Sequence, residues 1–177
     1  LTAGEIALVR PLFRTSVDYA SVRVRPERYT VFQPSDAYMT PDGSIYAPDL
    51  LFRDDFAATD AFLQAVFVHE MTHVWQHQNG VDMVAAWMNG IEHAEGDYES
   101  TYAYTLAPDV DLLDYGMEQQ ASIVEDYFLR CAHDAPPRRL ENPPSSDADA
   151  LYGQVLAALR ADPLYIRAGD ATTAHQP

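Results

Sequence analysis

The sequence predicts an α+β fold in which a small N-terminal β-sheet packs on a mainly helical core. Three patterns lead to this prediction. Apolar and polar side chains alternate over residues 21–25, an apolar helical pattern fills residues 60–79, and an amphipathic helical pattern fills residues 117–131. With 177 residues, 47% of them hydrophobic, the chain can bury one sizeable core.

The first third of the chain predicts one helix followed by short strands. The helix spans residues 2–13, because Thr2 and Glu5 have the spacing of a capping box and the apolar side chains that follow fall on one face. Three strand candidates come next, over residues 21–25, 29–32 and 44–46.

Helices dominate the rest of the chain. The clearest one spans residues 60–79, where Asp60 can cap the start and Asn79-Gly80 can end the helix. Its first half is apolar nearly all round, which is typical of a helix that runs through a core. Three further helices are expected, over residues 82–88, 117–131 and 149–160.

The Pro-rich stretch after the helix over residues 117–131 suggests how the chain is organised. We expect one domain over residues 1–134 and a linker over residues 135–147, where prolines cluster. Residues 148–177 are expected to form a C-terminal helix and, after Pro163, a loose tail, packed on the same domain.

The composition argues against several kinds of partner. Eleven Lys+Arg residues against 27 Asp+Glu residues give a formal net charge of −16, which repels phosphate backbones and anionic lipid, so no nucleic-acid partner is expected. The longest nearly apolar run, residues 81–88, is far shorter than the roughly 20 residues of a membrane span. No signal peptide is visible at the amino end, which leaves the cytoplasm or a signal-independent secretion system as expected locations. The single cysteine, Cys131, excludes a disulfide within the chain and is expected to be buried on its helix.

The core helix carries a metal-binding motif, His69-Glu70-Met71-Thr72-His73. The two histidines lie about 40° apart around the helix axis and roughly 6 Å apart along it, so both imidazoles can reach one Zn²⁺ ion. Glu70 projects beside that face, where it can take a proton from a metal-bound water without binding the metal. A chance match to this motif is expected only roughly 0.01 times in a chain with this His and Glu content.

A third protein ligand must come from another helix. His77 lies about 12 Å along the axis from His69, which is too far to share one ion, and is expected to be a helix-end residue. Glu118 and Glu125 share one face of the helix over residues 117–131, with small side chains between them that would let two helices approach closely. Glu118 is the expected ligand. Glu125 is the alternative ligand, or a hydrogen-bond partner of a zinc-binding histidine.

The two motifs together resemble the gluzincin branch of the zinc metallopeptidases. In that branch the first carboxylate of a helical Glu-x-x-Ala motif is the third zinc ligand, and this chain has Glu118-Gln119-Gln120-Ala121. The resemblance implies a zincin-like fold with one Zn²⁺ ion between two helices. Ser122 stands where many such families have Asp, so Glu125 or Asp126 would have to replace that carboxylate.

The chain also resembles the small bacterial proteins labelled Vgr-related. The opening run Leu1-Thr2-Ala3-Gly4-Glu5-Ile6-Ala7-Leu8 and the run His73-Val74-Trp75-Gln76 carry this resemblance, which extends to about Arg130. The family name implies an association with type VI secretion spikes. The expected partners are therefore a peptide or protein substrate and a VgrG-like spike protein.

Zincins commonly use a Tyr or His side chain to stabilise the oxyanion that develops during hydrolysis. Five candidates lie between the two expected metal-binding helices: His93, Tyr98, Tyr102, Tyr104 and Tyr115. Tyr104 is the preferred one. By fold analogy alone, the strand candidate at residues 44–46 is the sheet edge that would pair with an extended peptide.

These observations predict a zinc-dependent metallopeptidase that hydrolyses peptide bonds through a metal-activated water, with Glu70 as the general base. The main alternative is a non-catalytic zinc-binding structural or adaptor module of a secretion assembly. A hydrolase of cell-wall peptide cross-links and a metal-free helical interaction protein are further alternatives.

Overall fold

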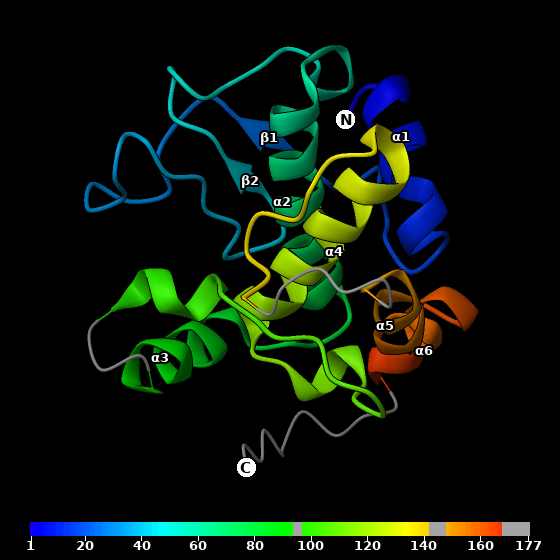
Figure 1. Ribbon diagram of the computed structural model, residues 1–177. Coiled ribbons are helices and arrows are strands. Elements are labelled where there is room, and N and C mark those ends of the chain that lie inside the picture. The colour runs from blue at the N-terminus through cyan, green and yellow to red at the C-terminus, as the bar shows by residue number, and fades with distance from the viewer. Residues whose placement is uncertain (94–96, 142–147, 168–177) are drawn as a thin grey trace.

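Two long helices packed side by side form the centre of the molecule (Figure 1). The computed structural model of the chain describes residues 1–93, 97–141 and 148–167. The central helices are α2 (Ala61–Gln78) and α4 (Met117–His133), and both confirm helices predicted from the sequence. Ala121 and Ser122 of α4 are fully buried, and their small side chains let the two helices approach closely.

The N-terminal helix α1 (Ala3–Phe13) begins with the predicted capping box. The hydroxyl of Thr2 accepts the backbone N–H of Glu5 at 3.0 Å, and Oε2 of Glu5 accepts the backbone N–H of Thr2 at 2.8 Å. Oε1 of the buried Glu5 also accepts the N–H of Phe56, the first residue of the 3₁₀ helix η1 (Phe56–Ala58), at 3.0 Å. One carboxylate therefore fixes both the start of α1 and the approach to α2.

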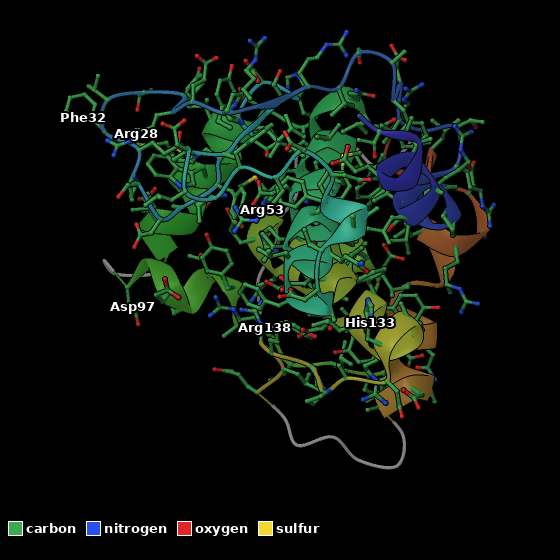
Figure 2. All side chains as sticks on the ribbon, turned by 90° about the horizontal axis from the view of Figure 1, so that it is seen from above. Arg28, Phe32, Arg53, Asp97, His133 and Arg138 are labelled. Carbon is green, nitrogen blue, oxygen red and sulfur yellow. The ribbon has the colours of Figure 1, made fainter. Side chains whose placement is uncertain are left out.

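The sheet is smaller than the sequence predicts. It consists of β1 (Val24–Arg25) and β2 (Ile45–Tyr46), which pair in parallel, so the chain between them must cross over instead of forming a hairpin. The strand predicted at residues 29–32 is wrong: this segment is an exposed loop. Phe32 is 90% exposed, and Figure 2 shows it at the outer end of the loop.

The prediction that residues 44–46 form a free sheet edge is also wrong. On one side, the N–H groups of Ile45 and Ala47 donate to the β1 side of the sheet. On the other side, the N–H and C=O groups of Tyr46 both bond to Met39, at 2.8 and 3.2 Å. Both edges of β2 are therefore occupied, and the outer position belongs to the segment around Met39.

The smaller helices surround this centre. They are α3 (Met83–His93), η2 (Tyr98–Tyr102), η3 (Leu112–Asp114), α5 (Ala148–Val155), α6 (Ala157–Ala161) and η4 (Tyr165–Arg167). α3 is longer than predicted, and the single helix predicted for residues 149–160 is interrupted at Leu156. None of the described helices is long and apolar enough to cross a lipid bilayer.

The last described segment packs on α2, although the sequence predicts a loose tail after Pro163. The indole N–H of Trp75 donates to the carbonyl of Pro163 at 2.8 Å, and the ring of Tyr165 stacks on Trp75. Ile166 is buried in the same core cluster as α1, α2 and α4. These contacts hold residues 163–167, while the rest of the predicted tail and residues 142–147 of the predicted linker lie outside the described residues.

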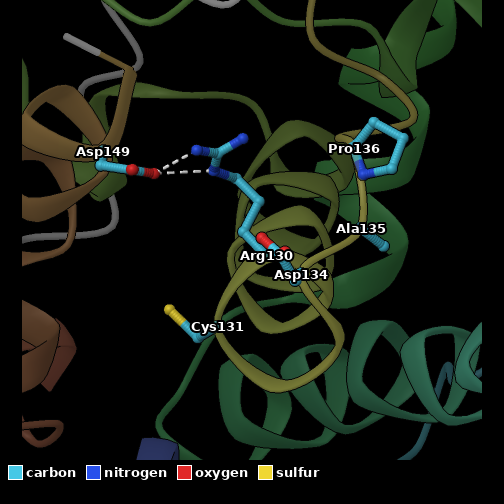
Figure 3. Close-up of a pocket in the computed structure, with 6 residues that line it drawn as sticks. All are labelled: Arg130, Cys131, Asp134, Ala135, Pro136 and Asp149. Atoms are coloured by element: carbon cyan, nitrogen blue, oxygen red, sulfur yellow. Dashed lines mark hydrogen bonds and ion pairs between the residues drawn. The ribbon is translucent and has the colours of Figure 1, made fainter. Parts of the chain in front are cut away.

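A pocket of about 450 Å³ lies at the C-terminal end of α4 (Figure 3). Its lining residues are Arg130, Cys131, Asp134, Ala135, Pro136 and Asp149. Cys131 is exposed there, so the prediction of a buried cysteine is wrong. The buried face of α4 ends at Leu129, and Cys131 falls beyond it. At 1.5 Å per residue, Arg130 lies about 18 Å along the helix from Glu118, so this pocket is separate from the predicted metal site.

Candidate metal centre

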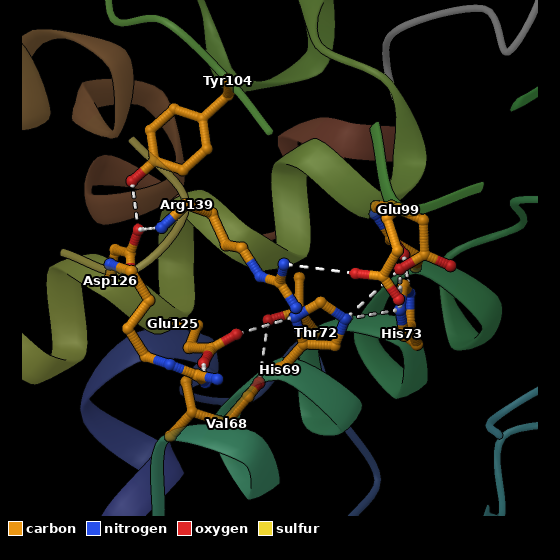
Figure 4. Close-up of polar contacts among 12 residues, drawn as sticks. Val68, His69, Thr72, His73, Glu99, Tyr104, Glu125, Asp126 and Arg139 are labelled. Atoms are coloured by element: carbon orange, nitrogen blue, oxygen red, sulfur yellow. Dashed lines mark hydrogen bonds and ion pairs between the residues drawn. The ribbon is translucent and has the colours of Figure 1, made fainter. Parts of the chain in front are cut away.

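Three buried side chains meet between α2 and α4. His69 and His73 come from successive turns of α2 (Figure 4), and Glu118 comes from the first turn of α4. The two Nε2 atoms lie 3.2 Å apart, and Oε2 of Glu118 lies 3.3 Å from the Nε2 atom of His69 and 3.1 Å from that of His73. Among the described residues, these three form the one His, Cys, Asp or Glu group with ligand atoms close enough to hold a metal ion.

The spacing of the three atoms fits a zinc ion. Ligands about 2.0–2.1 Å from a tetrahedral zinc lie roughly 3.3–3.4 Å from one another. The sides of the observed triangle, 3.1–3.3 Å, are close to this length. Two imidazole nitrogens and one carboxylate oxygen are also the donor set of a catalytic zinc, in which three protein ligands leave a fourth position open.

Hydrogen bonds on the far side of each imidazole fix which nitrogen faces the cluster. Nδ1 of His69 lies 3.1 Å from Oε2 of Glu125, and Nδ1 of His73 lies 2.8 Å from Oε1 of Gln76. Ionised carboxylate and amide oxygens only accept hydrogen bonds, so each Nδ1 carries a proton and each Nε2 faces the cluster, where its lone pair can bind a metal once the imidazole is neutral. The Gln76 amide is oriented by its own N–H group, which donates to Oε1 of Gln120 at 2.9 Å.

The electrostatics of the cluster favour a positive charge at its centre. Burial lowers the pKa of His69, but hydrogen bonds to Glu118 and Glu125 outweigh it and raise this pKa to about 10. Burial likewise lowers the pKa of His73, and the Glu118 carboxylate raises it above its usual value. Burial raises the pKa of Glu118, but the two histidines bring it below its usual range. In the metal-free protein this positive charge is a proton; a divalent cation can replace it.

Glu70 lies next to the cluster without joining it. Its carboxylate is buried, and its Oε2 accepts a hydrogen bond of 2.6 Å from the hydroxyl of Thr40. It lies close enough to help raise the pKa of both His69 and His73. Thr40 follows Met39, so the outer segment of the sheet is the element that holds Glu70 in place.

The three carboxylates of α4, those of Glu118, Glu125 and Asp126, contact different groups. Glu118 reaches the two Nε2 atoms, whereas Glu125 is seven residues further along and contacts the opposite nitrogen of His69. Asp126 faces away from the cluster and accepts the backbone N–H groups of Arg138 and Arg139. The sequence left Glu125 and Asp126 as candidates for the carboxylate beside a zinc-binding histidine. In the structure, Glu125 is the one that contacts a histidine.

The tyrosines expected near the site are placed differently from one another. The Tyr104 hydroxyl donates to Asp126 at 2.8 Å within the core, and only 1% of Tyr104 is exposed, so the structure does not bring it to the cluster (Figure 4). The ring of Tyr102 lies against His69, with 5.8 Å between the ring centroids. The Tyr115 hydroxyl donates to the backbone of Thr105. The side chains of His93 and Tyr98 lie outside the described part of the structure.

Sequence reasoning missed three residues of this region. Gln76 had a local signal, because it lies three residues after His73 and so shares its helix face. Thr40 and Arg138, which contact Glu70 and Glu125, had none. They come from a loop and from the predicted linker, so only the fold brings them to the site.

Comparisons with known proteins place this domain in a family. No protein-family model matches the chain. The solved structure of the effector domain of Pseudomonas aeruginosa VgrG2b is 37% identical in sequence and superposes with a TM-score of 0.70, over 90% of this chain and 82% of that one. The type VI secretion system spike protein VgrG2b of Pseudomonas aeruginosa is 44% identical over 132 residues, which are 73% of this chain and 13% of the spike protein.

The fold and the site define a mainly helical domain with a small parallel sheet and a candidate His-His-Glu metal centre between its two central helices. The chain belongs to the family of the VgrG2b effector domain. It is thus related to one part of a VgrG spike protein and spans 13% of that relative's length.

Proposed function

We propose that this chain is a zinc-dependent metallopeptidase that acts as an effector domain in type VI secretion. The observation that carries the proposal is the triangle of His69 Nε2, His73 Nε2 and Glu118 Oε2, with sides of 3.1–3.3 Å. The relation to the VgrG2b effector domain supports the secretion part of the proposal.

The residues around the triangle have the roles that peptide hydrolysis requires. Zinc, when bound, supplies a Lewis acid that polarises the substrate carbonyl and lowers the pKa of a coordinated water towards ~7. Glu70 accepts the proton of the attacking water. The hydroxyl of Thr40 donates to Oε2 of Glu70 and holds this carboxylate in place, which leaves Oε1 available to receive the proton. Tyr102, whose ring lies against His69, is the candidate for stabilising the oxyanion that develops during hydrolysis.

Substitution of Glu70 tests this proposal. Glu70→Gln keeps the size of the side chain and removes the base, so we expect wild-type zinc content with peptidase activity lowered by at least 100-fold. Activity is measured on a broad peptide library, with and without a chelator, and zinc is measured by elemental analysis. Full activity of a zinc-loaded Glu70→Gln protein would rule out Glu70 as the base.

A non-catalytic zinc-binding module is the second candidate, and one observation favours it. The three residues of the cluster and Glu70 are each at most 9% exposed, which is typical of metal sites that stabilise a fold. In that case His73→Ala would unfold the protein or lower its stability, while no peptide of the library would be cleaved by the wild-type protein. Chelator-sensitive cleavage by the wild type separates the two candidates in favour of the enzyme.

A further inference from the structure

Arg138 lies behind the candidate metal centre, in the segment that follows α4. Its guanidinium forms an ion pair with Oε1 of Glu125, and the guanidinium carbon lies 4.4 Å from the centroid of the Phe62 ring. The other oxygen of Glu125, Oε2, lies 3.1 Å from Nδ1 of His69. One buried carboxylate therefore links Arg138, which Figure 2 labels beside the central helices, to a proposed zinc ligand.

The backbone around Arg138 is held firmly in place. Asp126 accepts the N–H groups of Arg138 and Arg139 at 2.7 and 3.0 Å. The next residues pair with the backbone of Tyr104. The N–H of Tyr104 donates to the carbonyl of Arg139 at 3.2 Å, and its carbonyl accepts the N–H of Glu141 at 2.9 Å. These bonds fix the direction from which the guanidinium reaches Glu125.

The two partners of Glu125 together define its orientation. A carboxylate held at only one oxygen can turn about its terminal bond, whereas one held at both oxygens cannot. The side chain of Glu125 is 5% exposed, so water cannot replace a lost partner freely. Without Arg138, this carboxylate would lose the contact that directs Oε2 to the imidazole.

We propose that Arg138 is a positioning residue of the metal centre. It holds Glu125 in the orientation in which Oε2 accepts the Nδ1 proton of His69, and thereby keeps Nε2 of His69 directed at the metal. This inference rests on the proposed function, because it takes the cluster to be a zinc site. It assigns a role at the site to a segment that the sequence marks only as a linker.

Zinc affinity tests the proposal independently of activity. Arg138→Gln is expected to raise the zinc dissociation constant about 10- to 100-fold, the usual effect of losing a partner of a metal-binding side chain. The constant is measured on the full chain at one pH, by competition with a chromophoric chelator. Arg130→Gln is the matched control, because Arg130 pairs with the exposed Asp149 at the far end of α4. It is expected to bind zinc as the wild type does.

A conservative variant and a spectroscopic probe separate positioning from general stability. Arg138→Lys keeps the charge but not the fork of donors, so its zinc affinity should lie between those of the wild type and Arg138→Gln. The visible absorption of the Co²⁺-substituted protein should change in Arg138→Gln and not in Arg130→Gln. If Arg138→Gln does not fold, Arg138→Lys carries the test, and an affinity equal to the wild type would overturn the proposal.

A double-mutant cycle tests whether Arg138 acts through Glu125. In a Glu125→Gln background, Arg138→Gln should cause little further loss of zinc affinity. An additive loss, or wild-type affinity in the Arg138→Gln single variant, would overturn the inference and leave the proposed function intact. A wild-type protein that binds no zinc would instead overturn the proposed function.

Discussion

The Asp126 carboxylate is expected to be a major source of stability outside the metal centre. It is fully buried: Oδ1 accepts the N–H of Arg138 at 2.7 Å, and Oδ2 accepts the N–H of Arg139 at 3.0 Å and the hydroxyl of Tyr104 at 2.8 Å. These bonds attach the segment after α4 to the helix and to the core. The substitution Asp126→Asn keeps the shape of the side chain but replaces one acceptor with a donor.

The expected loss can be estimated from these three bonds. Hydrogen bonds to a charged group contribute about 1.5–3 kcal/mol each and neutral ones about 0.5–1.5 kcal/mol, and a buried donor without a partner costs about 1–3 kcal/mol. Burial raises the pKa of Asp126 above its usual value despite the three bonds, so the neutral amide recovers part of this loss. We expect a net loss of about 3 kcal/mol, which lowers the unfolding midpoint by roughly 6–12 °C in a domain of this size.

Thermal unfolding followed by circular dichroism measures this loss. A chelator is present throughout, so that zinc does not contribute to the midpoint. Asp149→Asn is the control, because this exposed carboxylate of α5 pairs with Arg130 of α4, and such surface pairs contribute only about 0–1 kcal/mol. A midpoint for Asp126→Asn within about 2 °C of the wild type would refute the reasoning.

Three further predictions concern the site and a turn next to it. In the metal-free protein, the pKa of His69 rises from 6.5 to about 10 on folding, so its contribution to stability is fully present below pH 6.5 and is lost as the pH rises through 10. The unfolding midpoint should therefore fall over that range, and less so in His69→Gln. Gly43→Ala should cost about 1–3 kcal/mol in urea unfolding, because Gly43 has a φ of +79° and a Cβ there would lie 2.7 Å from Cδ2 of His77; an unchanged midpoint would contradict this. Thr40→Val should lower kcat/KM about tenfold or more at unchanged zinc content, since it removes the 2.6 Å bond to Glu70; wild-type activity would show that this bond is dispensable.

The helices could be predicted because their signals are local. Thr2 and Glu5 satisfy each other's backbone groups within one turn, and Asp60 caps α2 by accepting the N–H of Leu63. The strands could not be predicted as well. β1 and β2 have two residues each and pair in parallel across a long connection, so too few alternating residues remain to define them.

The position of the Tyr104 side chain also depends on contacts between distant segments, and the sequence did not predict it. Tyr104 lies between the central helices in the sequence, which made it a candidate for the site. The fold instead places its hydroxyl on Asp126, because Tyr104 pairs with the segment after α4. No periodicity in a single segment carries that information.

By itself, the sequence determined the central helices and the convergence of His69 and His73 on one helix face, because helix geometry repeats every 3.6 residues whatever surrounds it. Only the tertiary structure decided that Glu118 reaches the Nε2 atoms and Glu125 the opposite nitrogen of His69. That choice depends on the register of α4 against α2, which is set by packing between residues 49 and 56 positions apart. Thr40 and Arg138 reach the site for the same reason: loops have no periodicity, and the packed core determines where they lie.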